Sequence, residues 1–196
     1  MHPWHDVDAG AKIPKHINVV VEIPKGSRNK YEYDEDLDAV VLDRFLSGST
    51  VYPTDYGFLI GHRGRDGDAL DCCVCVSEPT FPGCVIRVKP VALFKMEDEE
   101  GVDDKVICVP CGDPGWNTAA RRADLSEQLQ NEIGHFFAVY KDLEAKKVDI
   151  DGWYDVEEAR RVLADARRLE AEEGSGKHPL GRELTRLPAA RSPSRG

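Results

Sequence analysis

Short apolar runs separated by turn-forming residues dominate the first 110 residues of the chain. The runs cover residues 17–23, 31–33, 39–42, 70–76, 85–94 and 106–109. Because short strands joined by Gly, Pro and Asp turns are typical of all-β architectures rather than of alternating βαβ units, this pattern predicts a compact barrel. Cys72, Cys73 and Cys75 lie within one such run, so we expect them to be small buried hydrophobic residues.

Beyond residue 120 the apolar positions recur at helical spacing. One stripe consists of Leu125, Leu129, Ile133, Phe136, Phe137 and Tyr140, and a second of Val156, Ala159, Val162, Leu163, Ala166 and Leu169. Asp124 with Glu127, and Asp155 with Glu158, have the spacing of a capping box at the start of each helix. The chain is therefore predicted to be α+β, mainly β, with two C-terminal helices.

The last 23 residues lack this periodicity. Residues 174–196 contain three prolines and four arginines, and we expect them to form a flexible tail. A chain of 196 residues is long enough for one domain with a sizeable core.

Composition narrows the classes of partner. The chain has 36 acidic and 26 basic residues, a net charge of −10, which disfavours general binding to nucleic acid or to an anionic membrane. No stretch reaches the roughly 20 apolar residues of a membrane helix. The N-terminus has no basic segment followed by an apolar run, so we expect a cytoplasmic protein.

Three groups of side chains are candidates for chemistry. The three aspartates of residues 66–71 (DGDALD) repel one another unless a cation neutralises them, and carboxylate oxygens select hard cations such as magnesium, manganese or calcium. Taken alone, however, this segment also fits a solvated acidic turn. Residues 97–105 form a second acidic segment, held between two predicted strands. The third group suits phosphate oxygens and comprises Lys30, Arg44, Tyr52, Tyr56, Lys105, Tyr140 and Lys141.

In combination these residues resemble the soluble family I inorganic pyrophosphatases, whose signature is similar to residues 66–71. The resemblance spans roughly residues 17–170. It also includes Val21 to Pro24, Asn29 to Glu32, Leu42 to Phe45, Tyr52 to Phe58, Lys95-Met96, Asp98-Glu99, Asp103, Lys105 and His135 to Asp142. Ala69 departs from the family pattern, which usually has Pro or Glu there. Residues 17–173 are thus expected to be the pyrophosphatase domain, and residues 1–16 an N-terminal extension like that of some members.

The resemblance implies a five-stranded OB-like barrel flanked by the two helices, and hydrolysis of pyrophosphate to two orthophosphates. The metal would be Mg²⁺, with Mn²⁺ as a possible substitute. A homo-oligomer is also implied, with a hexamer favoured and a dimer as the alternative. The implied roles are metal ligands for Asp66, Asp71, Asp98 and Asp103, orientation of metal-bound water for Glu22, Glu32 and Glu99, general base for Asp68, and phosphate binding for Lys30, Arg44, Tyr56, Lys105, Tyr140 and Lys141.

Three alternatives remain at this point. A metal phosphohydrolase acting on a nucleotide would need a base-binding module, which the sequence does not show. An OB-like module for single-stranded nucleic acid would need a basic groove with stacking aromatic residues, and the charge of −10 argues against one. An inactive homologue would be expected to lack part of the residue set.

Overall fold

The structure is a computed structural model that describes residues 7–10, 13–34, 36–99, 101–144 and 146–173. The predicted tail at 174–196 and half of the predicted N-terminal extension, residues 1–6 and 11–12, lie outside these residues. Within the described part of the chain, no helix has the length and apolar character needed to cross a membrane.

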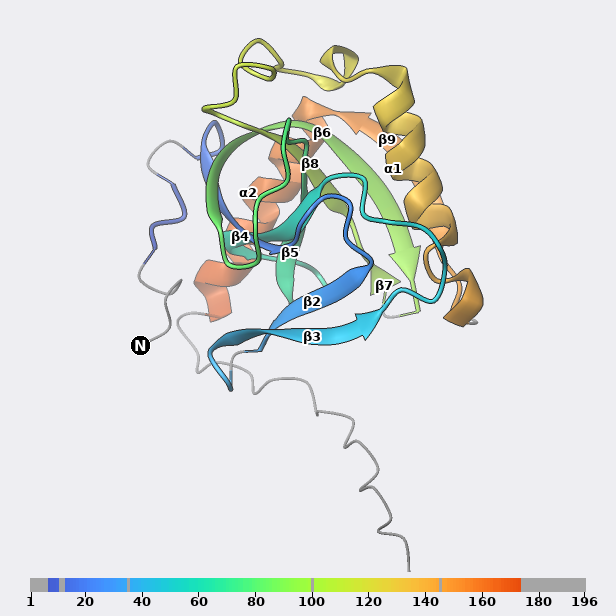
Figure 1. The fold of residues 1–196 in the computed structure, drawn as a ribbon. Helices are drawn as coiled ribbons and strands as arrows, with labels where there is room; N and C mark the ends of the chain where they lie inside the picture. Colours follow the sequence, from blue (N-terminus) through green and yellow to red (C-terminus); the bar gives the residue numbers. More distant parts are fainter. Residues whose placement is uncertain (1–6, 11–12, 35, 100, 145, 174–196) are drawn as a thin grey trace, which may run out of the picture.

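Five strands close into a ring, which confirms the predicted barrel (Figure 1). They are β1 (Ile17–Ile23), β4 (Asp55–Arg63), β5 (Ala69–Val74), β8 (Lys105–Pro110) and β6 (Val85–Asp98). Each strand pairs with the next in this order and β6 pairs with β1, so the ring has no free edge. β5 and β8 are parallel, and the other four pairings are antiparallel.

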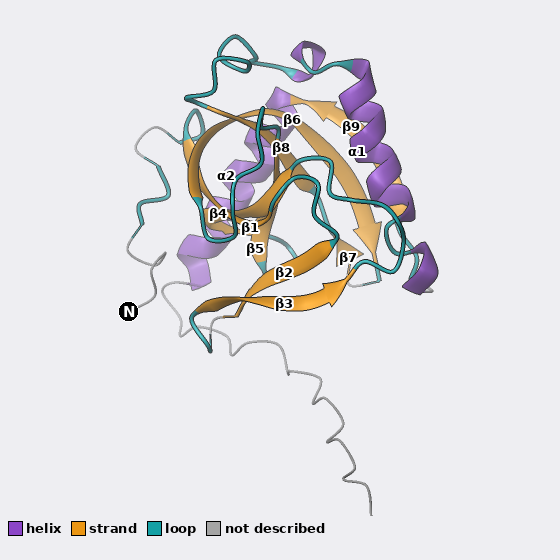
Figure 2. Ribbon diagram, in the orientation of Figure 1, coloured by secondary structure: helices purple, strands orange, loops and turns teal. Residues whose placement is uncertain are grey.

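The remaining elements surround this barrel (Figure 2). The 14-residue strand β6 extends beyond the ring and pairs there with β7 (Gly101–Val102) and β9 (Asp149–Asp155). β2 (Asn29–Asp34) and β3 (Ala39–Phe45) form a separate hairpin. The helix α2 (Val156–Glu173) packs against β4 and β6, and α1 (Glu127–Val139) lies beside β9. Two short 3₁₀ helices, η1 (Arg122–Asp124) and η2 (Asp142–Glu144), flank α1.

Strand alternation divides the core into two apolar clusters. On β5, Cys72 points into the cluster that contains Leu163 of α2, whereas Cys73 points into the cluster that contains Phe137 of α1. Successive side chains of a strand face opposite sides, so one strand serves both clusters. Cys72, Cys73 and Cys75 are buried free thiols, as the apolar run predicted.

The apolar pattern did not predict β4 and β9, and both contain glycines with structural roles. A Cβ atom on Gly57 of β4 would lie 1.9 Å from the carbonyl oxygen of Val20, so a glycine is needed for β1 to approach. Gly152 of β9 has a φ of 119°, a conformation that L side chains rarely adopt. Glycines and aspartates within these segments resemble turn signals, which hides the strands in the sequence.

The predicted capping box of α1 is wrong. The helix begins at Glu127 with Ser126 as its N-cap, and the Ser126 side chain accepts a hydrogen bond from the Leu129 N–H at 3.2 Å. Asp124 instead accepts a hydrogen bond from the Ala120 N–H, in the turn that precedes the helix. Both Ser and Asp can accept hydrogen bonds from the free N–H groups at the start of a helix. The sequence alone therefore does not show which of the two residues is the N-cap.

The second helix begins where predicted. α2 starts at Val156, whose N–H donates to Oδ1 of Asp155 at 2.8 Å. Glu158 forms an ion pair with Lys95 of β6 at 2.7 Å, which fastens the helix to the barrel.

His62 of β4 is a buried histidine whose charged form is disfavoured by its surroundings. The ring is 1% exposed, its Nδ1–H donates to the carbonyl oxygen of Ile60 at 2.9 Å, and its Nε2 has no hydrogen-bond partner among the described residues. Burial lowers the pKa of His62, and the hydrogen bond to Ile60 opposes this. The charged residues Arg167 and Glu170 of α2 act on the pKa in opposite directions.

We expect the free energy of unfolding to fall as the pH drops below about 6.5, the usual pKa of histidine. In that range the unfolded chain binds a proton that folded His62 does not yet accept, so protonation favours unfolding. Denaturant titrations between pH 5 and 8 should show a shallower acid decline for His62→Gln than for the unmodified protein. The matched control is His135→Gln, at an exposed histidine of α1. Equal slopes for His62→Gln and the unmodified protein would contradict this role.

Candidate active site

A buried lysine joins two of the predicted metal ligands. Lys105, at the start of β8, is 2% exposed, and its Nζ lies 2.5 Å from Oδ2 of Asp71 on β5 and also contacts Asp103. The Tyr56 hydroxyl of β4 donates to the same Asp71 oxygen at 2.5 Å. Tyr56, Asp71, Asp103 and Lys105 form what we call the central cluster, and parallel pairing of β5 with β8 places its two strands side by side.

Electrostatics hold the central lysine charged. Burial alone would lower the pKa of Lys105, but Asp71 and Asp103 outweigh burial and raise it well above the usual value. Burial raises the pKa of Asp103 to about 6, with Asp71 and Asp98 adding to the rise and Lys105 opposing it. Burial, together with the Asp71 charge, also raises the pKa of Tyr56 well above its usual value, so its hydroxyl keeps its proton. The cluster therefore carries more negative charge than its surroundings readily accommodate.

Glu22 of β1 connects the central cluster to the β2–β3 hairpin. Its Oε1 accepts a hydrogen bond from the Tyr33 N–H at 2.8 Å. Burial raises the pKa of Glu22 to about 8, and repulsion from Asp71 and Glu32 contributes, while the Tyr33 hydrogen bond and Lys30 oppose the rise. A carboxyl group perturbed in this way is typical of a functional site.

The hairpin carries a second set of charges, which we call the hairpin cluster: Lys30, Glu32, Asp43 and Arg44. Lys30 contacts Glu32 and lies 3.1 Å from Oδ2 of Asp43. The same oxygen lies 2.5 Å from Nη1 of Arg44. Burial would raise the pKa of Asp43, but Lys30 and Arg44 outweigh it and lower the pKa. The pairing of Lys30 with Arg44 across β2 and β3 therefore presents two cations side by side.

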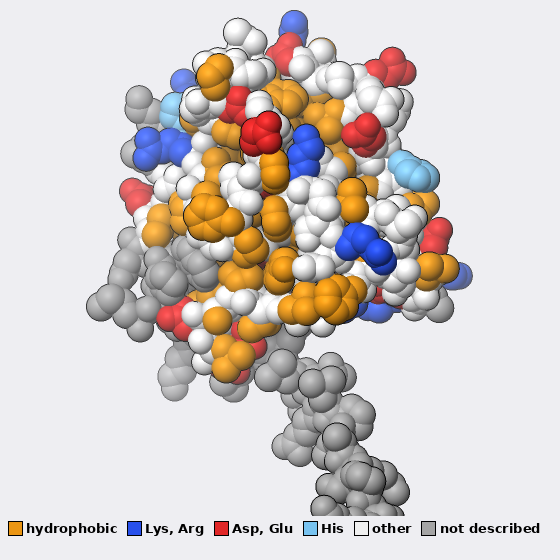
Figure 3. Space-filling model, in the orientation of Figure 1, with side chains coloured by type: hydrophobic (Ala, Val, Ile, Leu, Met, Phe, Trp, Pro, Cys, Tyr) orange, Lys and Arg blue, Asp and Glu red, His pale blue; other side chains and the backbone are white. Residues whose placement is uncertain are grey.

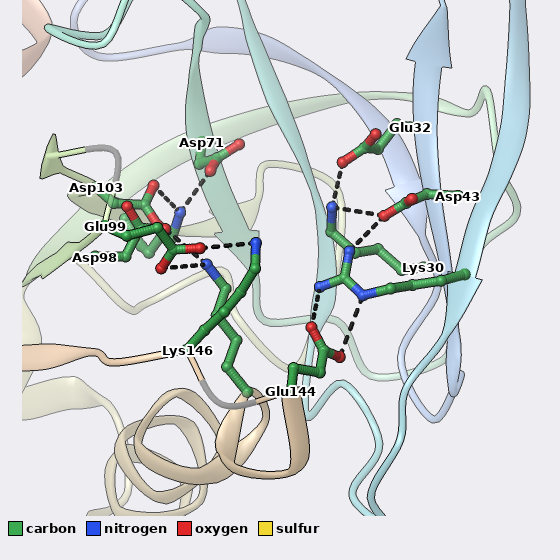
Figure 4. Close-up of polar contacts among 12 residues, drawn as sticks. Lys30, Glu32, Asp43, Asp71, Asp98, Glu99, Asp103, Glu144 and Lys146 are labelled. Atoms are coloured by element: carbon green, nitrogen blue, oxygen red, sulfur yellow. Dashed lines mark hydrogen bonds and ion pairs between the residues drawn. The ribbon is translucent and has the colours of Figure 1, made fainter. Parts of the chain in front are cut away.

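The segment that follows α1 supplies a third set of contacts (Figure 4). Lys141 lies 2.6 Å from Oδ2 of Asp98, and Lys146 lies 2.7 Å from Oε1 of Glu99, both at the end of β6. Tyr140 is buried at the C-terminal end of α1, with its ring stacked on Phe136 at a centroid distance of 5.2 Å. The phosphate-binding role of Tyr140 and Lys141 stays a prediction.

The DGDALD segment forms the turn before β5, with Asp66 to Asp68, and the first three residues of that strand. Asp66, Asp71 and Asp103 line one cavity of about 690 Å³. Oδ1 of Asp66 accepts a hydrogen bond from the Asp68 N–H at 3.0 Å, and Gly67 has a φ of 94°, which permits the tight bend. Asp68 is exposed at this turn. The turn thus brings Asp66 and Asp71 to a common cavity and leaves Asp68 accessible beside it.

The donor set suits a hard cation. Among the described residues, no three carboxylate, histidine or cysteine side chains are gathered into a ready-made metal shell. Lys105 and Lys141 neutralise the carboxylates instead. Asp66, Asp71, Asp98 and Asp103 offer oxygen donors alone, which fits Mg²⁺ or Mn²⁺, and the raised pKa of Asp103 reflects an acidic site that a cation would relieve.

Three residues of the charge network were not among the predicted site residues. Asp43 directly precedes Arg44 in a segment that carried the family resemblance, so the sequence did hold a signal for it. Glu144 pairs with Arg44, and Lys146 pairs with Glu99. Both lie in a charged stretch after α1 that resembles any solvated surface, so no pattern in the sequence points to them.

Comparison with known proteins identifies the family. The family model described as "Inorganic pyrophosphatase" matches residues 19–170. The chain belongs to this family. Among relatives of this pyrophosphatase domain, the inorganic pyrophosphatase of Methanosarcina mazei is 51% identical over 149 residues, which cover 76% of this chain and 88% of the relative. That of Haloferax volcanii is 47% identical over 167 residues, covering 85% of this chain and 94% of the relative.

A solved structure agrees with the sequence comparison. The crystal structure of inorganic pyrophosphatase from Thermus thermophilus superimposes with a TM-score of 0.83 at 41% identity, covering 86% of this chain and 98% of that chain. The family and the barrel predicted from the sequence are therefore both confirmed.

Proposed function

We propose that the chain hydrolyses inorganic pyrophosphate to two orthophosphates by direct attack of a metal-activated water. The observation that carries the proposal is the central cluster, in which a buried, charged lysine lies between two carboxylates beside the paired cations of the hairpin cluster. Such an arrangement can bind a polyanion and its counter-cations together. Family membership supports pyrophosphate as the polyanion.

Four aspartates would hold the divalent cation: Asp66, Asp71, Asp98 and Asp103. Mg²⁺ is proposed, with Mn²⁺ as a substitute, because both prefer oxygen ligands. When bound, such a cation lowers the pKa of a water and neutralises charge on phosphate oxygens. Glu22, Glu32 and Glu99 would accept hydrogen bonds from water molecules bound to the cation.

The cationic and hydroxylic side chains would bind the phosphates. Positioning and charge stabilisation dominate phosphoryl transfer, and these groups are suited to both. Burial would lower the pKa of Lys105, but Asp71 and Asp103 outweigh it and raise the pKa, which favours the charged form that binds phosphate. Asp68, on the exposed turn, would accept the proton of the attacking water through its carboxylate. The phosphate-binding set is Lys30, Arg44, Tyr56, Lys105, Tyr140 and Lys141.

We also propose a cytoplasmic homo-oligomer, with a hexamer favoured over a dimer, and no nucleic-acid or membrane partner. The net charge of −10 supports the absence of polyanionic partners.

The surface of the protein supports the homo-oligomer. Figure 3 shows apolar side chains over much of one face, and Phe45 and Phe81 are among the exposed large apolar residues. Exposed apolar surface of this kind typically marks contacts between proteins.

Phosphate release from three mixtures tests the substrate and the metal. The protein should release two phosphates per pyrophosphate with Mg²⁺, and release should stop when a chelator is added. With a nucleoside triphosphate and Mg²⁺, phosphate release should be far slower, because we find no site for a nucleotide base among the described residues. Faster release from the triphosphate than from pyrophosphate would favour the nucleotide phosphohydrolase instead.

A further inference from the structure

Arg44 is held through its three guanidinium nitrogen atoms by two carboxylates, one adjacent in the sequence and one far from it. Its Nε donates to Oε1 of Glu144 at 3.2 Å, and its Nη2 lies 3.0 Å from Oε2 of the same group. Its Nη1 lies 2.5 Å from Oδ2 of Asp43. Figure 4 shows the Glu144 carboxylate facing the guanidinium group with both oxygens. This two-point contact fixes the plane of the guanidinium group as well as its position.

The contacts leave part of the Arg44 guanidinium available for a phosphate. An arginine side chain has five N–H donors in a rigid fork, and the Glu144 and Asp43 contacts use three of them. Glu144 engages the Nε side of the fork. A phosphate can therefore bind through the remaining donors while Glu144 stays in place.

Glu144 itself is held by the segment that carries other predicted phosphate ligands. It is the last residue of η2, and its N–H donates to the carbonyl oxygen of Lys141 at 2.9 Å. Its side chain is only 13% exposed, so the ion pair with Arg44 is better shielded than a surface pair. The turn after α1 thereby connects Tyr140 and Lys141 to the hairpin that bears Arg44.

We propose that Glu144 is a positioning residue that orients the Arg44 guanidinium for phosphate binding, a role that rests on the proposed function. Glu144 touches neither substrate nor metal and acts through Arg44 alone. Its removal should therefore weaken the binding of phosphate ligands more than it slows turnover, because Arg44 then loses its fixed orientation before the substrate arrives.

A double-mutant cycle tests this coupling. For Glu144→Gln, which keeps the shape of the side chain and removes its charge, we expect KM for magnesium pyrophosphate to rise about tenfold, near the low end for losing a hydrogen bond to a charged group. The Kd of methylenediphosphonate, a non-hydrolysable analogue, should rise by a similar factor, with a smaller change in kcat. In an Arg44→Ala background, Glu144→Gln should change KM and Kd by less than about twofold. The matched control is Glu172→Gln, which removes a carboxylate paired with Arg168 at 3.0 Å on α2.

Each other outcome would overturn the proposal in a recognisable way. Equal effects of Glu144→Gln in both backgrounds would show that Glu144 does not act through Arg44. Tighter analogue binding by Glu144→Gln would show that the carboxylate competes with phosphate. A loss matched by Glu172→Gln, together with a lowered thermal midpoint, would reveal a purely structural role. Unchanged analogue binding by Arg44→Ala would instead overturn the phosphate-binding role of Arg44, and absent hydrolysis by the unmodified protein would overturn the proposed function.

Discussion

Asp68→Asn is expected to lower kcat for pyrophosphate hydrolysis by about 10²–10⁴-fold, the usual contribution of a general base, with little change in divalent-cation affinity. The Asp68 side chain is exposed on the turn before β5, and its backbone N–H contacts Asp66. Asparagine keeps the size of the side chain and that backbone contact, so the turn and its neighbouring aspartates should stay in place. What the variant loses is a carboxylate that can take a proton from water.

The measurement is steady-state phosphate release at saturating Mg²⁺, together with a cation titration of the variant. Asp36→Asn is the matched control, because Asp36 is an exposed turn aspartate in the β2–β3 connection. The control should keep the rate of the unmodified protein. Turnover by Asp68→Asn near that rate would show that another group accepts the proton.

Asp71→Ala is expected to weaken Mg²⁺ binding by more than about 100-fold, since even the outer partners of metal ligands typically contribute 10–100-fold. One oxygen of Asp71 accepts both the Tyr56 hydroxyl and the Lys105 ammonium at 2.5 Å. Removing it takes away a proposed ligand and leaves Lys105 to pair with Asp103 alone. Turnover should fall as well, because both the cation and the lysine are then misplaced.

Mn²⁺ titration followed by electron paramagnetic resonance measures this affinity without relying on activity. Asp151→Ala is the matched control, because Asp151 lines the same cavity but is not a proposed ligand. If both variants weaken Mn²⁺ binding equally, the effect is a general loss of negative charge. Unchanged Mn²⁺ affinity in Asp71→Ala would remove Asp71 from the ligand set.

Most of the barrel was predictable because four of its five strands are short apolar runs. β1, β5, β6 and β8 contain apolar runs that the sequence displays directly. β4 and β9 were hidden because each contains a glycine, which is rarely found in strands. Gly57 is needed for the close approach of a neighbouring strand, and Gly152 for its positive φ. Contacts between strands that are distant in the sequence select these glycines, so the local pattern of apolar residues does not predict the two strands.

The candidate site shows the same division between local and long-range information. The residue types of the site were predicted through motifs that resemble a family. The ion pairs between them were not predictable, since Arg44 and Glu144 are 100 residues apart in the sequence. Which cation meets which carboxylate depends on how the hairpin, the barrel and the end of α1 come together.

Anomalous diffraction from crystals grown with Mn²⁺ and methylenediphosphonate tests the proposed metal site most directly. We expect a manganese peak in contact with the carboxylates of Asp66, Asp71 and Asp103, with the phosphonates against Lys30 and Arg44. Manganese bound away from all three aspartates, with the analogue in place, would contradict it.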